Sequence, residues 1–145
     1  MIVRMLAVTT LMLVASLVQA QNKAPPDRML EALVKTTLLT FNDANVTGNY
    51  DVFHAKLSRP FREQFSAERL ARQFQEFNRK HIDFDIIAAL KPVYDAVPKV
   101  DDKGKLLVKG HFPTEPKQVN FDLEFIPSDG EWKLIGINVK LGDPK

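Results

Sequence analysis

Hydrophobic side chains recur three and four positions apart in the stretch that follows residue 26. The inward-facing positions of this stretch are Leu30, Leu33, Val34, Thr37, Leu38 and Phe41. Such spacing places them on one face of an amphipathic helix. Asp27 is a residue type favoured at helix N-caps, and Gly48 is one that ends helices in the left-handed conformation. The pattern therefore predicts a helix between these two residues.

Two further helices are predicted in the next thirty or so positions. The first begins near Asn49 or Asp51 and buries Phe53 and Leu57. The second begins at Ser66, whose hydroxyl can cap a helix N-terminus. Its inward-facing positions are Leu70, Phe74 and Phe77. Together with the first helix, these segments make a set of three N-terminal helices.

Beyond His81 the pattern alternates with a period of two, which is typical of β-strands. The alternating segments are 82–86, 106–112, 119–125 and 132–141, and residues 92–100 predict a bent, extended edge segment. The alternation changes phase beside Gly136, which predicts a β-bulge in the last strand. Helices followed by an antiparallel meander define an α+β fold class. We expect three N-terminal helices packed on a curved antiparallel sheet of about four strands.

The first 20 residues have the pattern of a cleavable signal peptide. Arg4 precedes an apolar stretch, and Val18 and Ala20 place small residues where signal peptidase cleaves. We therefore expect residues 1–20 to be removed, residues 21–26 to form a short tether and residues 27–142 to form one domain. The expected location is the periplasm or the outside of the cell, with no membrane span after cleavage.

Composition argues against several functional classes. The chain contains no Cys, so an exported domain of this sequence depends on its core for stability. A net charge of +2 gives no reason to expect nucleic acid as a partner. The spacing of His54, His81 and His111 matches no metal-binding motif, and every Gly is isolated, so we expect neither a metal nor another cofactor. Strand alternation predicts that His111 is solvated.

Three short segments carry a family resemblance: GNYD at 48–51, FPTEP at 112–116 and DGEWKL at 129–134. With the order of the elements, they resemble the nuclear transport factor 2-like superfamily, whose cystatin-like fold is a cone. The resemblance covers most of residues 27–141. It implies a cavity between the concave face of the sheet and the helices, and a homodimer through the outer face of the sheet. It implies no single activity, because this fold hosts isomerases, cyclases, dehydratases and binding modules.

We expect a non-catalytic binding or interaction module with a mostly apolar cavity, for a small apolar ligand or a protein partner. The candidate ligand-binding residues are Tyr50, Phe53, His54, Arg59 and Tyr94. One alternative is an isomerase- or cyclase-type enzyme that uses a pocket carboxylate as base and Tyr94 as hydrogen-bond donor. Another is a scaffold subunit of a cell-envelope assembly. The polar strand face that bears Asn120, Asp122 and Glu124 is available for self-association.

Overall fold

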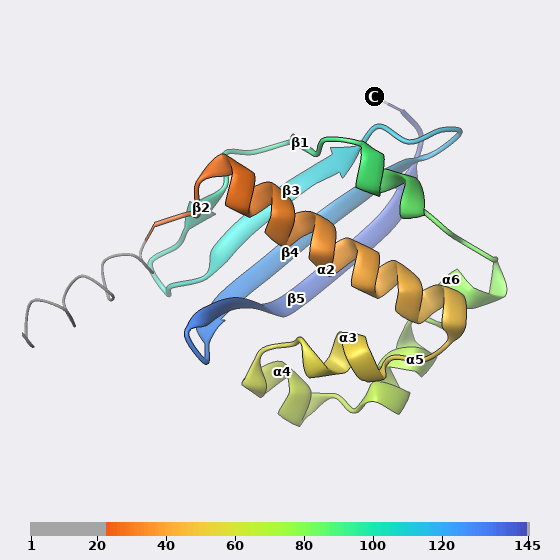
Figure 1. Cartoon of the computed structure of the whole chain (residues 1–145), viewed down its shortest axis with the longest axis horizontal. Coiled ribbons are helices and arrows are strands. Elements are labelled where there is room, and N and C mark those ends of the chain that lie inside the picture. The colour runs from red at the N-terminus through yellow and green to blue at the C-terminus, as the bar shows by residue number, and fades with distance from the viewer. Residues whose placement is uncertain (1–22, 145) are drawn as a thin grey trace, which may run out of the picture.

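Helices come first along the chain and strands second, as the hydrophobic pattern predicts (Figure 1). The computed structural model describes residues 23–144, so the predicted signal peptide and its cleavage site lie outside the described residues. The helices in this range are α2 (Asp27–Thr47), α3 (Asp51–Ala55), α4 (Arg59–Gln64), α5 (Ala67–Gln73), α6 (Gln75–Arg79) and the 3-10 helix η1 (Asp85–Ala89). The strands are β1 (Val93–Tyr94), β2 (Lys99–Val100), β3 (Leu106–Phe112), β4 (Gln118–Ser128) and β5 (Glu131–Gly142). The α+β class with an antiparallel sheet is confirmed.

Helix α2 is the helix that the first pattern predicts. It ends at Thr47, and Gly48 follows with a φ of 71°, the left-handed conformation expected at this position. Pro26 occupies the N-cap, so Asp27 lies one position later, in the first turn, where its charge suits the helix dipole. The side chains that α2 buries in the core are Leu30, Val34, Leu38, Phe41 and Ala44.

Five α-helices occupy the described region in which three were predicted. Helix α3 matches the second prediction and buries Phe53, whereas α4 is a separate helix that follows Ser58. The predicted third helix is divided into α5 and α6 at Phe74, whose φ of −103° and ψ of 14° depart from helical values. Ser66 caps α5 as expected, because its Oγ accepts a hydrogen bond from the backbone N–H of Arg69 at 3.2 Å.

Strands β3, β4 and β5 form a meander, and β1 and β2 both pair with the free edge of β3. The last two strands change register within their pairing. Glu124 pairs with Gly136, but Phe125 pairs with Leu134, so that Ile135 is an extra residue on β5. The bulge predicted beside Gly136 is therefore confirmed.

The prediction of a strand over residues 82–86 is wrong. The side chain of Asn42 on α2 donates from Nδ2 to Asp83 Oδ1 at 2.8 Å and accepts from the backbone N–H of Phe84 at 2.9 Å. These two bonds hold the chain against the helix, and η1 follows directly. Alternation places Ile86 inside, but its side chain is 56% exposed and Ile87 is buried instead. A helical turn, rather than a strand, satisfies the backbone here.

Helix α2 lies across one face of the sheet (Figure 1). Helices α3 and α6 contact α2, and α4 contacts β5. The sheet side chains that face the helices and are buried include Leu106, Val108, Phe112, Val119, Phe121, Leu123 and Phe125. Their neighbours of opposite parity, such as Lys109 and Asp122, are exposed. The sheet is thus apolar on one face and polar on the other, which is typical of an antiparallel sheet covered on one side.

Candidate functional site

A cavity of about 320 Å³ lies between α2, the segment after α3 and the β4–β5 hairpin. Its apolar wall consists of Leu33, Phe53, Ala55, Leu57, Phe125, Trp132 and Leu134. Its polar wall consists of Thr36, Thr37, Thr40, Lys56, Glu131 and Lys133. Small-molecule sites generally have volumes of about 300 to 1,000 Å³, and this cavity lies at the lower end of that range.

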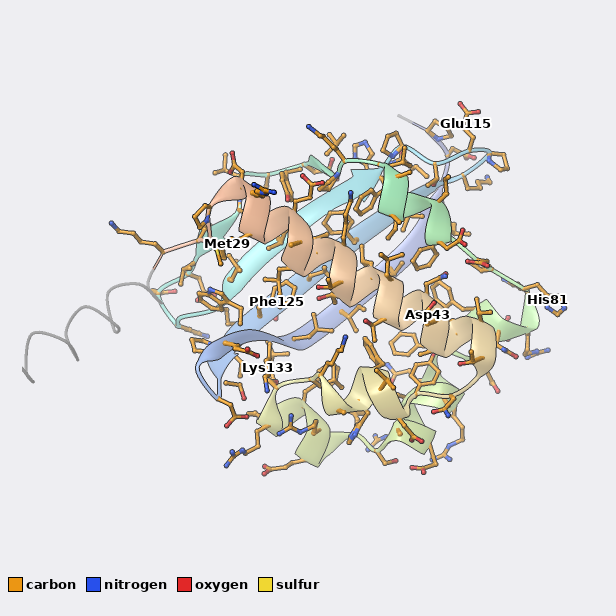
Figure 2. The ribbon with its side chains drawn as sticks, viewed as in Figure 1. Met29, Asp43, His81, Glu115, Phe125 and Lys133 are labelled. Atoms are coloured by element: carbon orange, nitrogen blue, oxygen red, sulfur yellow. The ribbon has the colours of Figure 1, made fainter. Side chains whose placement is uncertain are left out.

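A second cavity of about 440 Å³ adjoins the first and opens beside the first turns of α2. The two cavities share the wall residues Leu33, Thr36, Glu131 and Trp132. The second is completed by Pro25, Met29, Ala32, Pro127 and Gly130. We call the first cavity the inner lobe, the second the outer lobe and the two together the groove. Figure 2 shows Met29 near the start of α2, Phe125 on the sheet and Lys133 just beyond the β4–β5 turn.

Helix α2 contributes to the groove through the flank of its buried stripe. Leu33 and Thr37 belong to the predicted inward-facing positions but stay partly exposed, because this side of the helix faces the groove rather than the core. Thr36 and Thr40 lie beside them and are exposed to different degrees. One face of the helix therefore serves two purposes: its centre packs against the sheet, and its flank forms a wall.

The opposite wall is held in place by contacts between the start of α4 and the β4–β5 hairpin. The backbone N–H of Ser58 donates to the carbonyl oxygen of Leu134 at 3.0 Å, and the N–H of Arg59 donates to Ser128 Oγ at 3.2 Å. The Arg59 guanidinium also pairs with Asp129 at 2.9 Å. These bonds fix the hairpin relative to the helices and so determine the width of the groove.

Phe53 is the candidate ligand-binding residue that the described structure places in the groove wall. The Tyr50 hydroxyl is buried and donates to Asn45 Oδ1. His54 donates from Nε2 to the carbonyl oxygen of Phe65 at 2.7 Å, because a carbonyl oxygen can only accept. Both polar side chains are thus engaged in holding the short helices together.

Arg59 and Tyr94 lie away from the groove. Arg59 is exposed and binds Asp129 on the hairpin turn. Tyr94 on β1 faces the helices, and its buried hydroxyl has no hydrogen-bond partner among residues 23–144. Burial raises the pKa of the Tyr94 phenol above its ordinary value, and the charges of Glu31 and Asp27 raise it further. The five candidate residues are therefore not brought together in one place.

The unpaired phenol gives a direct stability prediction. Tyr94→Phe removes a buried hydroxyl that lacks a partner, so we expect the free energy of unfolding to stay unchanged or to rise by up to about 1 kcal/mol. The matched control is Tyr50→Phe, which breaks the buried bond to Asn45 and should cost about 1–3 kcal/mol. Urea denaturation of both variants checks the prediction, and a loss in Tyr94→Phe as large as that in Tyr50→Phe would contradict it.

The groove offers little support for the enzyme alternative. Among the described Asp and Glu residues, Glu131 is the one in the wall of either lobe. Its side chain is exposed, and it forms no hydrogen bond with a Tyr or His in the part of the chain described. An acid–base mechanism needs a carboxylate and a donor that both reach the same reacting group. Glu131 and Tyr94 are not arranged in this way, because Tyr94 lines neither lobe.

The prediction that His111 is solvated is wrong. Its Nδ1 lies 2.9 Å from Asp95 Oδ1, and its side chain is only 14% exposed. The pair lies on the outer face of the sheet, where a polar hollow of about 370 Å³ is lined in part by Asp95, Lys109, Asn120 and Asp122. Within residues 23–144, no group of three or more His, Cys, Asp or Glu residues is placed to hold a metal ion.

Sequence reasoning missed most of the groove. The alternating pattern places Trp132 on a strand, and the helical pattern places Thr37 on the inward face of the first helix, without a shared site. One signal was available: Trp132 is the only Trp in the chain and follows a turn, a position where a large ring is rarely buried completely. The threonines give no signal, because helical spacing alone does not distinguish a solvated helix face from the wall of a groove.

Comparisons with protein-family models, with curated proteins and with solved structures give no match to this chain. In the part of the chain that the structure describes, every helix is too short or too polar to cross a membrane.

Proposed function

We propose that this protein is an exported, non-catalytic binding protein of the nuclear transport factor 2-like superfamily, and that a small, largely apolar molecule binds in its groove. The helix-then-meander order and the three sequence motifs support the superfamily. The pattern of residues 1–20 supports export. The observation that carries the binding role is a pair of adjoining lobes that share four wall residues, have a mainly apolar wall and are of the size that small ligands occupy.

Apolar surface at the groove provides the driving force. Met29 is 64% exposed, and Trp132 and Leu33 are partly exposed on either side of the same lobe. An apolar ligand in the groove would remove these surfaces and its own from water, which is favourable in proportion to the area buried. The polar residues at the rim would fix its orientation rather than supply most of the affinity.

Fluorescence of Trp132 tests the binding role, since this side chain lines both lobes and is the only Trp. Titration with 1-decanol should give a saturable change in emission. Thr36→Phe places a large ring where the lobes meet and should weaken binding by at least about tenfold, that is by about 1.4 kcal/mol. Asp43→Phe, at an exposed position on the same helix but outside the groove, is the matched control and should bind as the wild type does.

Native mass spectrometry of the protein from its natural host completes this test. We expect the mass of a chain that begins at Gln21, together with a retained small molecule. No saturable fluorescence response and no retained molecule would contradict the binding role. A stable complex with other envelope proteins would favour the scaffold alternative, and a mass that still includes residues 1–20 would contradict export.

A further inference from the structure

The two lobes differ in charge, and this difference defines an orientation for the ligand. The outer lobe is lined by Pro25, Met29, Ala32, Pro127 and Gly130 in addition to the shared residues, and none of the described residues that line it is cationic. The inner lobe contains two, Lys56 and Lys133. A ligand that fits both lobes would therefore have an apolar end beside Met29 and a polar end at the lysines.

The hydroxyl of Thr37 is available to such a polar end. Thr36 Oγ1 donates to the carbonyl oxygen of Ala32 at 2.8 Å, and Thr40 Oγ1 donates to that of Thr36 at 2.7 Å. Both hydroxyls are thus engaged by their own helix. Thr37 also lines the inner lobe, but its hydroxyl makes no hydrogen bond within residues 23–144. It can donate to a ligand without breaking an existing bond.

The charges around the inner lobe favour an anion. Lys56 has no carboxylate partner among the described residues, and Lys133 Nζ lies 3.6 Å from Asp129 Oδ2, a long contact. Asp129 is also engaged by the guanidinium of Arg59 at 2.9 Å. The Lys133 side chain is only 19% exposed, so its charge is poorly screened by water. The opposing charge is Glu131, whose exposed carboxylate lies in the part of the wall that both lobes share.

We infer that the ligand is an aliphatic carboxylic acid with an unbranched alkyl chain, with its carboxylate at Lys56, Lys133 and Thr37 in the inner lobe and its alkyl chain in the outer lobe. This inference rests on the proposed binding function and adds the chemical class of the ligand. A carboxylate can accept from both ammonium groups and from the hydroxyl at once, because it has two oxygen atoms with about four acceptor positions. The alkyl chain would cover Met29 and Trp132, which the free protein leaves exposed or partly exposed.

Three probes with the same alkyl chain separate head-group recognition from apolar binding: decanoate, 1-decanol and decyltrimethylammonium. Each is titrated below its micelle concentration, with Trp132 emission and calorimetry as readouts. We expect decanoate to bind about fivefold or more tighter than decanol, and the cation to bind most weakly. Equal affinity for decanoate and decanol would overturn the inference but leave the proposed function intact. Binding of none of the three would contradict the proposed function itself.

Single variants locate the head group. We expect the affinity for decanoate to fall by about threefold to tenfold in each of the variants Thr37→Val, Lys56→Gln and Lys133→Gln. The affinity for decanol should stay within about twofold of the wild-type value. Thr47→Val is the matched control for the loss of a threonine hydroxyl, because Thr47 lies on the same helix outside both lobes and its Oγ1 donates to the carbonyl oxygen of Asp43; it should leave the affinity for decanoate unchanged. Glu131→Gln should raise the affinity for decanoate or leave that affinity unchanged. Equal losses for decanoate and decanol, or tightest binding of the cation, would overturn the inference. Urea denaturation of each variant establishes that it is folded.

Discussion

Replacing Phe41 by Ala should lower the free energy of unfolding by about 3–5 kcal/mol. The Phe41 ring is completely buried at the centre of an aromatic cluster. Its centroid lies 5.5 Å from that of Phe53, 4.9 Å from Phe74 and 5.4 Å from Phe77, so it joins α2 to α3 and to the α5–α6 junction. Truncation removes these contacts and leaves a cavity that the surrounding rings can fill only in part. Because domains of this size are stable by only about 5–15 kcal/mol, the variant should lose a large fraction of its stability.

Urea denaturation followed by circular dichroism measures this loss. Phe65→Ala is the matched control, because Phe65 is partly exposed and its ring meets only the Phe61 ring, at 5.4 Å, and the Arg69 guanidinium, at 4.8 Å, within the described residues. It should cost about 1–2 kcal/mol. A loss of less than about 1 kcal/mol in Phe41→Ala would show that the aromatic cluster does not organise the helices.

Gly110→Ala is the second substitution with a large expected effect. A Cβ atom at this position would lie 2.3 Å from the carbonyl oxygen of Val93 and 3.1 Å from Cα of Tyr94, both in the backbone of β1. Backbone atoms in a paired strand cannot move aside without breaking the pairing. We therefore expect β1 to separate from β3, at a cost of about 1–3 kcal/mol.

Hydrogen exchange reports this separation directly. The backbone N–H of Asp95 donates to the carbonyl oxygen of Lys109 at 2.9 Å, next to the pairing of β1 with β3, and should exchange much faster in Gly110→Ala. The control is Gly136→Ala, whose Cβ would meet the flexible end of Glu124 at 3.2 Å. Its stability should change by less than about 1 kcal/mol in either direction. Similar behaviour of the two variants would argue against the clash.

The local pattern of hydrophobic and polar residues correctly predicted the elements in which a single period, of 3.6 or 2 residues, persists and one face is buried. The stripe on α2, the alternation on β3 and β4 and the change of phase beside Gly136 all appear in the structure. The prediction failed where a side chain from a distant segment changes the backbone. Asn42 binds both Asp83 and Phe84, so a segment with strand-like alternation becomes a loop followed by a 3-10 turn.

Neighbouring segments also decided how exposed individual side chains are. Alternation correctly separated His111 from the buried residues of β3, but Asp95 on the neighbouring edge covers it. The prediction of the candidate site from the sequence was also incomplete. Phe53 was included, whereas Trp132, Thr37 and the lysines of the groove were not. No spacing rule connects these residues, because they belong to segments that meet only after folding.

The sequence by itself determined the order of the elements and the faces that become buried, because periods of 3.6 and 2 residues are set by backbone geometry. The expectation of export also comes from the sequence alone, through the pattern of residues 1–20. Only the tertiary structure decided where the groove lies. It exists because the β4–β5 hairpin is fixed to the start of α4 through Ser58 and Arg59, which leaves the flank of α2 uncovered. A groove of this kind depends on the distance between two elements, and that distance is a property of their packing and not of either segment alone.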